Sequence, residues 1–98
     1  MKPCKRLEIV VEKPLARRVA SALLEAGAPG YTMIDQASGM GDRGVRHADD
    51  PTGTSTNCLL IIACETEDEA SALVESVRPI LTRSGGICLV TDALWVRH

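Results

Sequence analysis

The seven residues CLLIIAC, at positions 58–64, form the longest uninterrupted apolar run of the chain. A run of this length predicts a strand that is apolar on both of its faces. Thr66 follows closely, and Glu69 stands three residues beyond it. This is the spacing of a helix capping box, in which the threonine hydroxyl accepts from the Glu69 N–H while the Glu69 side chain reaches back. The stretch therefore predicts a buried strand that leads directly into a helix.

The residues after the capping box continue this helix and then end it. Its apolar stripe consists of Ala70, Leu73, Val74, Val77 and Leu81. Pro79 interrupts the stripe and predicts a kink or a break near residues 75–78. The triplet SGG at positions 84–86 ends the helix as a C-cap, which leaves room for a second role in binding. Residues 87–97 predict a long final strand.

The sequence before the apolar run holds another strand and helix. Residues 5–13 alternate apolar and mostly charged side chains, which predicts a half-buried strand. Pro14 suits the first turn of a helix, because that turn does not need its N–H. The apolar stripe of this helix consists of Leu15, Val19, Leu23 and Ala26. Gly27 ends the helix, and residues 31–37 predict one more strand.

Residues 38–57 differ in kind from the segments around them. They hold four glycines, one proline and five serines or threonines, with almost no apolar residue. Such a composition cannot pack as an ordinary element, and its length indicates either a functional loop or a disordered one. We expect this loop to gain its order from contacts with ligands.

The predicted elements follow the order βαββαβ, which defines an α+β, ferredoxin-like fold. Its four-stranded antiparallel sheet carries both helices on one face and leaves the other face bare. Residues 58–64 are nevertheless apolar on both sides, and the last strand begins with the apolar residues ICLV at 87–90. Because a contiguous apolar face marks a partner surface, the pattern favours an oligomer.

Composition narrows the class of protein further. The 98 residues suffice for one domain, which we place at 1–98, and the net charge of −2 argues against a nucleic-acid partner. None of the four cysteines forms a CxxC pair, so they predict small buried side chains in a reducing compartment. The amino terminus has no apolar signal core, and no apolar run approaches about 20 residues, which predicts a soluble, cytoplasmic protein.

A glycine motif opens the long loop. Gly39, Gly41 and Gly44 match G-x-G-x-x-G, but no helix follows them, so a Rossmann site is not indicated. Successive glycines can still form a nest of N–H groups for phosphate or carboxylate, with plain flexibility as the alternative. Arg43 and Arg46 stand beside these glycines, and guanidinium groups bind such anions with two hydrogen bonds. Simple solvation of both arginines is the competing interpretation.

Metal binding and catalysis find less support. Asp42, His47, Asp49 and Asp50 offer oxygen and nitrogen ligands, but their spacing matches no recognised metal loop, so no metal ligand is assigned. The only histidines are His47 and the terminal His98, and no nucleophile–base spacing accompanies them. No catalytic residue is assigned.

Three short motifs give the chain a family resemblance. They are Gly30-Tyr31-Thr32, the loop motif Gly39-x-Gly41-x-Arg43-x-x-Arg46, and the turn Gly85-Gly86-Ile87. In this order and spacing they resemble the PII-like signalling proteins over nearly the whole chain. The similarity is greatest to the carboxysome-associated, bicarbonate-responsive branch.

The resemblance implies a regulatory sensor and not an enzyme, built as a homotrimer whose bare sheet faces meet around the threefold axis. Residues 38–57 would be the long T-loop and residues 82–87 the B-loop, with adenine nucleotides in the clefts between subunits. The implied nucleotide-binding residues are Gly39, Met40, Gly41, Arg43, Arg46, Ser84, Gly85, Gly86, Ile87 and Arg97. Bicarbonate is implied beside the nucleotide, on Gly41, Arg43 and Arg46.

Departures from the family pattern bear on the ligand and the partner. The T-loop has no tyrosine for uridylylation, and the lysine-bearing motif T-G-x-x-G-D-G-K is replaced by the short RSGG at 83–86. With less positive charge there, we expect ADP or AMP in preference to ATP, with cyclic AMP as a further candidate.

The implied partner is a bicarbonate transporter or another carbon-uptake protein, which would bring the chain to a membrane transporter or a carboxysome. A metal-responsive or other small-molecule-binding trimer and a small nucleotide-acting enzyme are the alternatives.

Overall fold

The computed structural model describes residues 1–41, 44–46 and 56–96. Its elements, in chain order, are β1 (Lys2–Glu12), the short helix η1 (Lys13–Leu15), α1 (Ala16–Glu25), β2 (Thr32–Ala37), β3 (Gly39–Gly41), β4 (Gly44–Arg46), β5 (Asn57–Cys64), α2 (Glu67–Ser84) and β6 (Ile87–Trp95). The predicted βαββαβ order is confirmed, with the short pair β3 and β4 inserted between β2 and β5.

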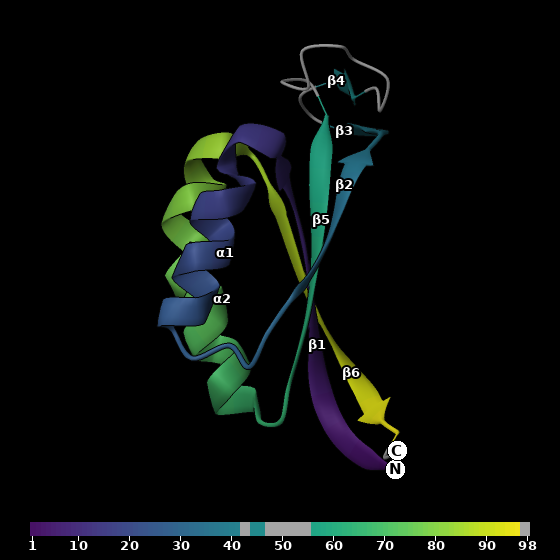
Figure 1. The fold of residues 1–98 in the computed structure, drawn as a ribbon, viewed down its shortest axis with the longest axis vertical. Helices are drawn as coiled ribbons and strands as arrows, with labels where there is room; N and C mark the ends of the chain where they lie inside the picture. Colours follow the sequence, from purple (N-terminus) through teal and green to yellow (C-terminus); the bar gives the residue numbers. More distant parts are fainter. Residues whose placement is uncertain (42–43, 47–55, 97–98) are drawn as a thin grey trace.

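Within the described ranges, four strands form one antiparallel sheet in the order β2-β5-β1-β6. Both helices cover the same face of this sheet (Figure 1). The two ends of the chain pair directly, since Lys2 of β1 lies opposite Trp95 of β6. The predicted ferredoxin-like, α+β class is therefore confirmed.

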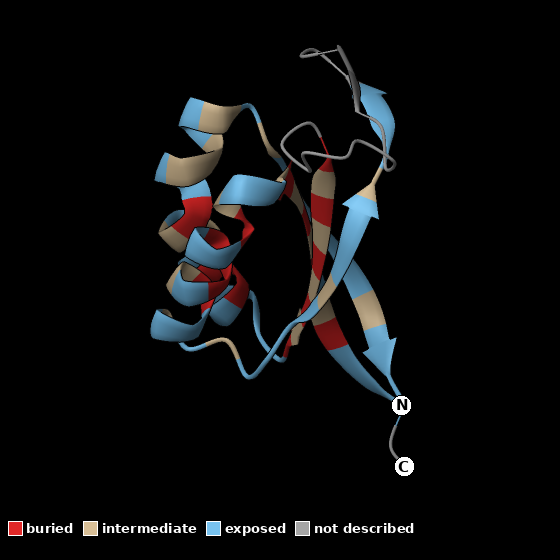
Figure 2. Ribbon diagram, turned by 45° about the horizontal axis from the view of Figure 1, so that its top comes forward, coloured by how far each residue is buried: buried red, intermediate tan, exposed pale blue. Residues whose placement is uncertain are grey.

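Alternation along the central strands sends one set of side chains toward the helices. On β1 these are Leu7, Ile9 and Val11, each at most 1% exposed. Strand β5 and both helices complete the layer with Cys58, Leu60, Ile62, Cys64, Val19, Leu23, Ala70, Leu73 and Val77. Burial of each larger aliphatic side chain contributes about 1.5–3 kcal/mol, so this layer holds the fold together (red in Figure 2). The cysteines that lie in it are free thiols, as predicted.

No helix of the described ranges covers the opposite face of the sheet. Because directly paired residues point to the same face, its side chains fall into rows across the strands. The row nearest the glycine turns consists of Ile34, Leu59, Val10 and Ile87. The next row consists of Thr32, Ile61, Glu8 and Leu89. We call these two rows the bare face. Its predicted apolar character is confirmed for the first row, whereas Thr32 and Glu8 make the second row mixed.

Helix α2 runs through Pro79 without a break, so of the predicted kink or break near residues 75–78 the break is wrong. Proline removes the N–H that would bond to the carbonyl of Glu75. Both residues are exposed, which lets water satisfy that carbonyl. Buried Leu73 and Val77 meanwhile hold the preceding turn against the sheet.

The start of α2 also differs from the prediction in one contact. The Thr66 hydroxyl accepts from the Glu69 N–H at 3.1 Å, as expected. The Glu69 carboxylate, however, accepts from the N–H of Glu65 at 3.0 Å, one residue before the cap. The acidic first turn of the helix is still joined to the end of β5, since the Glu69 side chain spans the connection.

Three predicted features differ in the structure. β1 begins at Lys2 and not at residue 5, because β6 supplies partners for its first residues. β6 ends at Trp95, so the prediction that this strand continues to residue 97 is wrong at Val96. Residue 97 lies outside the described residues. Regular structure in the long loop, at Gly39–Gly41 and Gly44–Arg46, corrects the prediction that residues 38–57 have none.

Candidate functional site

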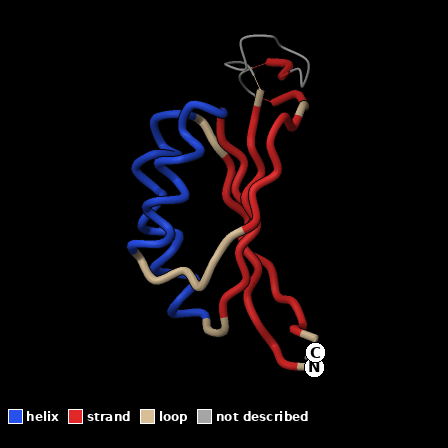
Figure 3. The backbone as a smooth tube through the Cα atoms, in the orientation of Figure 1, coloured by secondary structure: helices blue, strands red, loops and turns tan. Residues whose placement is uncertain are grey.

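The two glycine-bearing turns lie at the same end of the sheet, opposite the chain termini (Figure 3). One turn follows β2 and leads into β3, and the other joins α2 to β6. Strands β5 and β1 separate β2 from β6, so three interstrand spacings, about 14 Å in all, lie between the two turns. The described residues that were predicted to bind nucleotide thus lie at one end of the sheet, and a ligand that contacted both turns would have to span that distance.

The turn after α2 is a closed helix cap. Gly85 has the left-handed φ of 74°, and its N–H donates to the carbonyl of Leu81 at 2.9 Å. The Gly86 N–H donates to the Ser84 hydroxyl at 3.3 Å. The predicted C-cap is confirmed, and both glycine amides are used inside the chain. The Ser84 hydroxyl accepts in this bond, so its own proton can still be donated to a ligand.

The turn after β2 is open by contrast. A Cβ atom on Gly39 would meet nothing within 4 Å, and Met40 is 81% exposed. The backbones of β3 and β4 pair, with Gly39 opposite Arg46 and Gly41 opposite Gly44. Among the described residues, none fills the space in front of Gly39.

Two of the predicted binding residues, Arg43 and Arg97, lie outside the described residues. The same holds for the loop residues of the alternative metal site, Asp42, His47, Asp49 and Asp50. Within the ranges that the structure describes, no three His, Cys, Asp or Glu side chains converge on a point that could hold a metal ion.

The root of the loop contains a feature that sequence reasoning missed. β2 pairs with β5 up to Ile34 and again from Ala37, and it uses three steps there where β5 uses two. This is a β-bulge, which leaves one extra residue on β2. Gln36, inside the bulge, has a φ of 57°, a left-handed conformation that is uncommon for a residue with a side chain.

The Asp35 carboxylate joins this bulge to its neighbours. One oxygen accepts from the Gln36 N–H at 2.7 Å and from the Cys58 thiol at 3.3 Å. The other oxygen pairs with Lys13 Nζ at 3.1 Å. The backbone N–H of Lys13 also donates to the carbonyl of Thr56 at 3.0 Å, so Lys13 contacts both legs of the loop. The available sequence signal was an aspartate inside a strand, where acidic residues are disfavoured.

These contacts shift the pKa values of Asp35 and Cys58 in opposite directions. The hydrogen bond from the Gln36 N–H, followed by that from Lys13, lowers the pKa of Asp35. Burial, followed by the hydrogen bond to Asp35, raises the pKa of the Cys58 thiol to about 11. At neutral pH Asp35 is therefore an ionised acceptor and Cys58 a protonated donor, which is the state that the network requires.

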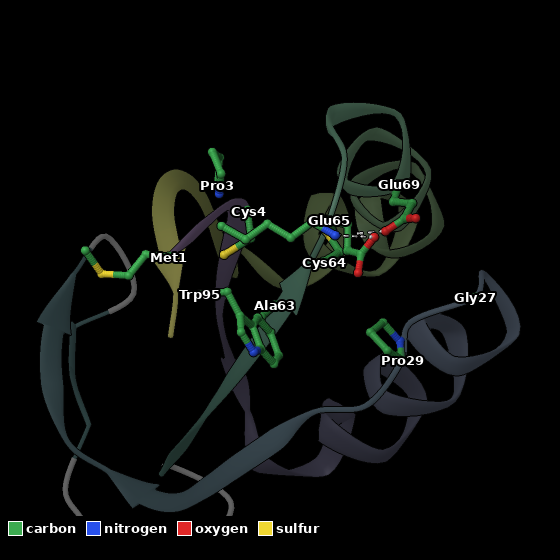
Figure 4. A pocket seen from close by; sticks show the side chains of 11 residues that line it. Met1, Pro3, Cys4, Gly27, Pro29, Ala63, Cys64, Glu65, Glu69 and Trp95 are labelled. Carbon is green, nitrogen blue, oxygen red and sulfur yellow. Dashed lines mark hydrogen bonds and ion pairs between the residues drawn. The ribbon is translucent and has the colours of Figure 1, made fainter. Parts of the chain in front are cut away.

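A cavity of about 700 Å³ lies at the other end of the molecule, beside the termini (Figure 4). Its lining includes Cys4, Pro29 and Trp95, together with the ion pair of Lys2 and Glu65 at 3.3 Å. None of the predicted nucleotide-binding residues that the structure describes lines it. The cavity is therefore separate from the two glycine turns.

Membrane insertion finds no support in the helices of the described ranges, none of which is both long and apolar enough to cross a bilayer.

The fold and the loops together define a ferredoxin-like α+β domain with a long insertion between β2 and β5 and a glycine turn before β6. The profile of the family described as nitrogen regulatory protein P-II matches residues 4–98. The chain belongs to this family of regulatory signalling proteins, and the PII-like identification made from its motifs is confirmed.

Solved structures agree with this assignment. CPII, a nitrogen regulatory PII-like protein from Thiomonas intermedia K12 bound to ADP, AMP and bicarbonate, is 27% identical, with a TM-score of 0.86 over 97% of this chain and 90% of that chain. The same protein bound to ADP and bicarbonate, also 27% identical, matches with a TM-score of 0.82 over the same shares. CutA from Synechococcus elongatus PCC7942 is 14% identical with a TM-score of 0.69, over 96% of this chain and 83% of that chain. At that identity CutA shows the shared fold alone.

Proposed function

We propose that the protein is a sensor that binds an adenine nucleotide and bicarbonate in the clefts between the subunits of a homotrimer. The observation that carries the proposal is the position of the two glycine turns, at one end of the sheet and directly beside the bare face. Ile87 follows Gly86 and belongs to the first row of that face, as does Ile34 just before the bulge. A ligand between the turns would therefore lie next to the surface on which another subunit packs. CPII, the 27% identical protein from Thiomonas intermedia K12, supports the ligand class.

The bare face supplies the surface that a trimer needs. Ile34, Ile87 and Leu89 are each about half exposed in the single chain. Burying the rest of such a side chain contributes on the order of 1 kcal/mol, and the rows hold several of them in each subunit. Glu8 of the bare face forms an ion pair, at 2.9 Å, with Arg6 in the next row on the same side of the sheet. Because the two charges compensate each other within one subunit, enclosing them does not bury an unpaired charge.

The proposed contacts divide by chemistry. Charge assigns the phosphate groups to Arg43 and Arg46 of the long loop and to Arg97, since guanidinium binds phosphate with two hydrogen bonds. Because β6 ends at the opposite end of the sheet from the two turns, Arg97 would come from a neighbouring subunit. Gly39 and Gly41 allow the ligand to approach the backbone, and Met40 can cover an apolar part of it. The amides of Gly85 and Gly86 already have partners, so the second turn would contribute the Ser84 hydroxyl, the Ile87 side chain and close approach at the glycines. We place bicarbonate on Gly41, Arg43 and Arg46.

Signalling would follow from shared contacts. If nucleotide and bicarbonate both bind residues of the long loop, each ligand favours the loop conformation that the other requires. The loop in that conformation would then bind or release a partner, which we propose is a bicarbonate transporter or another carbon-uptake protein. We propose no catalytic step and no covalently bound cofactor.

Calorimetric titration with AMP, ADP, ATP and cyclic AMP, each with and without bicarbonate, tests the proposal. We expect saturable binding of ADP or AMP, tighter than that of ATP, and tighter again when bicarbonate is present. Absence of binding by all four nucleotides in both conditions would contradict it.

A further inference from the structure

The backbone of the loop root is strained at one residue. Among the described non-glycine residues, Gln36 is the one with a positive φ, and its bulge is the one register shift recorded for the four-stranded sheet. A left-handed residue with a side chain persists only where its surroundings hold it in place. Bulges of this kind redirect a strand, and they are common beside binding sites.

The side chain of the neighbouring residue, Asp35, holds the backbone of Gln36 in place. That carboxylate receives the Gln36 N–H, the Cys58 thiol on β5 and the Lys13 ammonium at the start of η1. Through its backbone, Lys13 also holds the carbonyl of Thr56, on the leg of the loop that returns to β5. One charged pair therefore joins both legs of the loop to the start of the first helix.

The bulge lies directly before the open turn. β3 begins at Gly39, two residues after Ala37 resumes its pairing with β5. The path of the backbone at Gln36 therefore sets where Gly39 and Met40 stand relative to the closed turn at Gly86.

We infer that Asp35 is a positioning residue for nucleotide binding: it holds the bulge at Gln36 through Lys13 and Cys58, and thereby sets the place of Gly39 and Met40. This inference rests on the proposed function, because it assigns the nucleotide to the turn that begins at Gly39.

The competing account is that Asp35 and Lys13 form an ordinary surface ion pair. Their side chains are 48% and 43% exposed, and such pairs stabilise a fold only slightly. An ordinary pair would change the free energy of unfolding without changing ligand affinity in the folded protein. A positioning pair changes affinity, and its two members act as a unit.

The test is the dissociation constant of ADP, measured by calorimetry on the whole chain, for Asp35→Asn, Lys13→Met and the double variant. We expect each single variant to bind ADP about fivefold more weakly, and the double variant to be no worse than either one. Lys13→Arg keeps the charge and should bind like the unmodified protein. Glu75→Gln removes a comparable exposed pair, that of Glu75 with Arg78 at 2.9 Å on α2, and should also leave affinity unchanged.

ADP binding by the unmodified chain separates failure of this inference from failure of the proposed function. Amide hydrogen exchange of the nucleotide-free chain should become faster at Gln36 and Ala37 in Asp35→Asn and in Lys13→Met. If the unmodified chain binds no nucleotide, the proposed function falls, and the positioning role falls with it, whatever the exchange rates. If the unmodified chain binds ADP and both single variants bind it equally well, or if their effects add in the double variant, the positioning role alone is overturned.

Discussion

The carbonyl oxygen of Val10 lies 2.9 Å from the place that a Cβ atom on Gly86 would take. The side chains of Leu81 and Val11 lie 2.8 and 3.0 Å from the same place. A side chain could displace Leu81, but the Val10 carbonyl belongs to the backbone of a central strand and cannot move independently. Packing therefore requires glycine at this position of the turn, whether or not a ligand binds there.

Replacing Gly86 with alanine should lower the free energy of unfolding by about 1–3 kcal/mol, because the added methyl group is forced into a filled space. Urea denaturation measures this change. Gly39→Ala is the matched control, since its Cβ would meet nothing within 4 Å and should change stability by no more than about 0.5 kcal/mol. The same control should weaken ADP binding if the ligand occupies that free space. Equal stability of the two variants would contradict the packing argument.

Removing the cap of α2 should also have a measurable cost. Thr66→Ala deletes the hydroxyl that accepts from the Glu69 N–H, and we expect the free energy of unfolding to fall by about 1 kcal/mol. Thr66→Ser keeps the acceptor and should restore most of the loss. A serine variant as unstable as the alanine variant would show that the methyl group, and not the hydrogen bond, is what matters.

The Gly86 turn and the Thr66 cap show which parts of the fold can be predicted from a few neighbouring residues. The capping residue and the glycine turn were predictable, because spacing along a few residues determines them. The first residues of β1 were not, since Lys2 becomes part of a strand only by pairing with Trp95 at the other end of the chain. The continuity of α2 through Pro79 likewise depends on which side of the helix faces water.

The candidate site also contains residues that could be predicted from the sequence and residues that could not. Gly85, Gly86 and Ile87 could be predicted from a motif that is contiguous in the sequence. The role of Asp35 could not, because its partners Lys13 and Cys58 come from different elements. The extra residue of the bulge is visible only in the register of two strands that are joined by the long loop.

The trimer can be tested with a pair of leucines of similar exposure. Leu89 on the bare face is 54% exposed, and Leu24 on α1 is 51% exposed. Leu89→Lys places a charge in the proposed interface and should reduce the mass measured by light scattering from trimer to monomer. Leu24→Lys should leave the trimer intact. A trimeric Leu89→Lys variant, or a monomeric unmodified chain, would contradict the assigned interface.

Acidification should remove the contribution of Asp35 to stability. The pKa of Asp35 is lowered from its ordinary 3.8 in the folded chain, so folding favours the ionised carboxylate. That contribution is complete above the ordinary value and is lost as the pH falls through the lowered folded pKa. We therefore expect the stability difference between the unmodified chain and Asp35→Asn to be constant near neutral pH and to shrink below about pH 4. Urea denaturation over a pH series measures it, and a difference that grows on acidification would have the wrong sign.

The central claim is that one site senses nucleotide and bicarbonate together. Its most direct test is the dissociation constant of ADP, measured by calorimetry across a series of bicarbonate concentrations at fixed pH and fixed ionic strength, with chloride replacing bicarbonate as the control anion. The account predicts that ADP affinity rises with bicarbonate and then levels off, and that ADP tightens bicarbonate binding by the same factor, because coupling between two ligands is reciprocal. An ADP affinity that stays flat across the bicarbonate series would contradict the account.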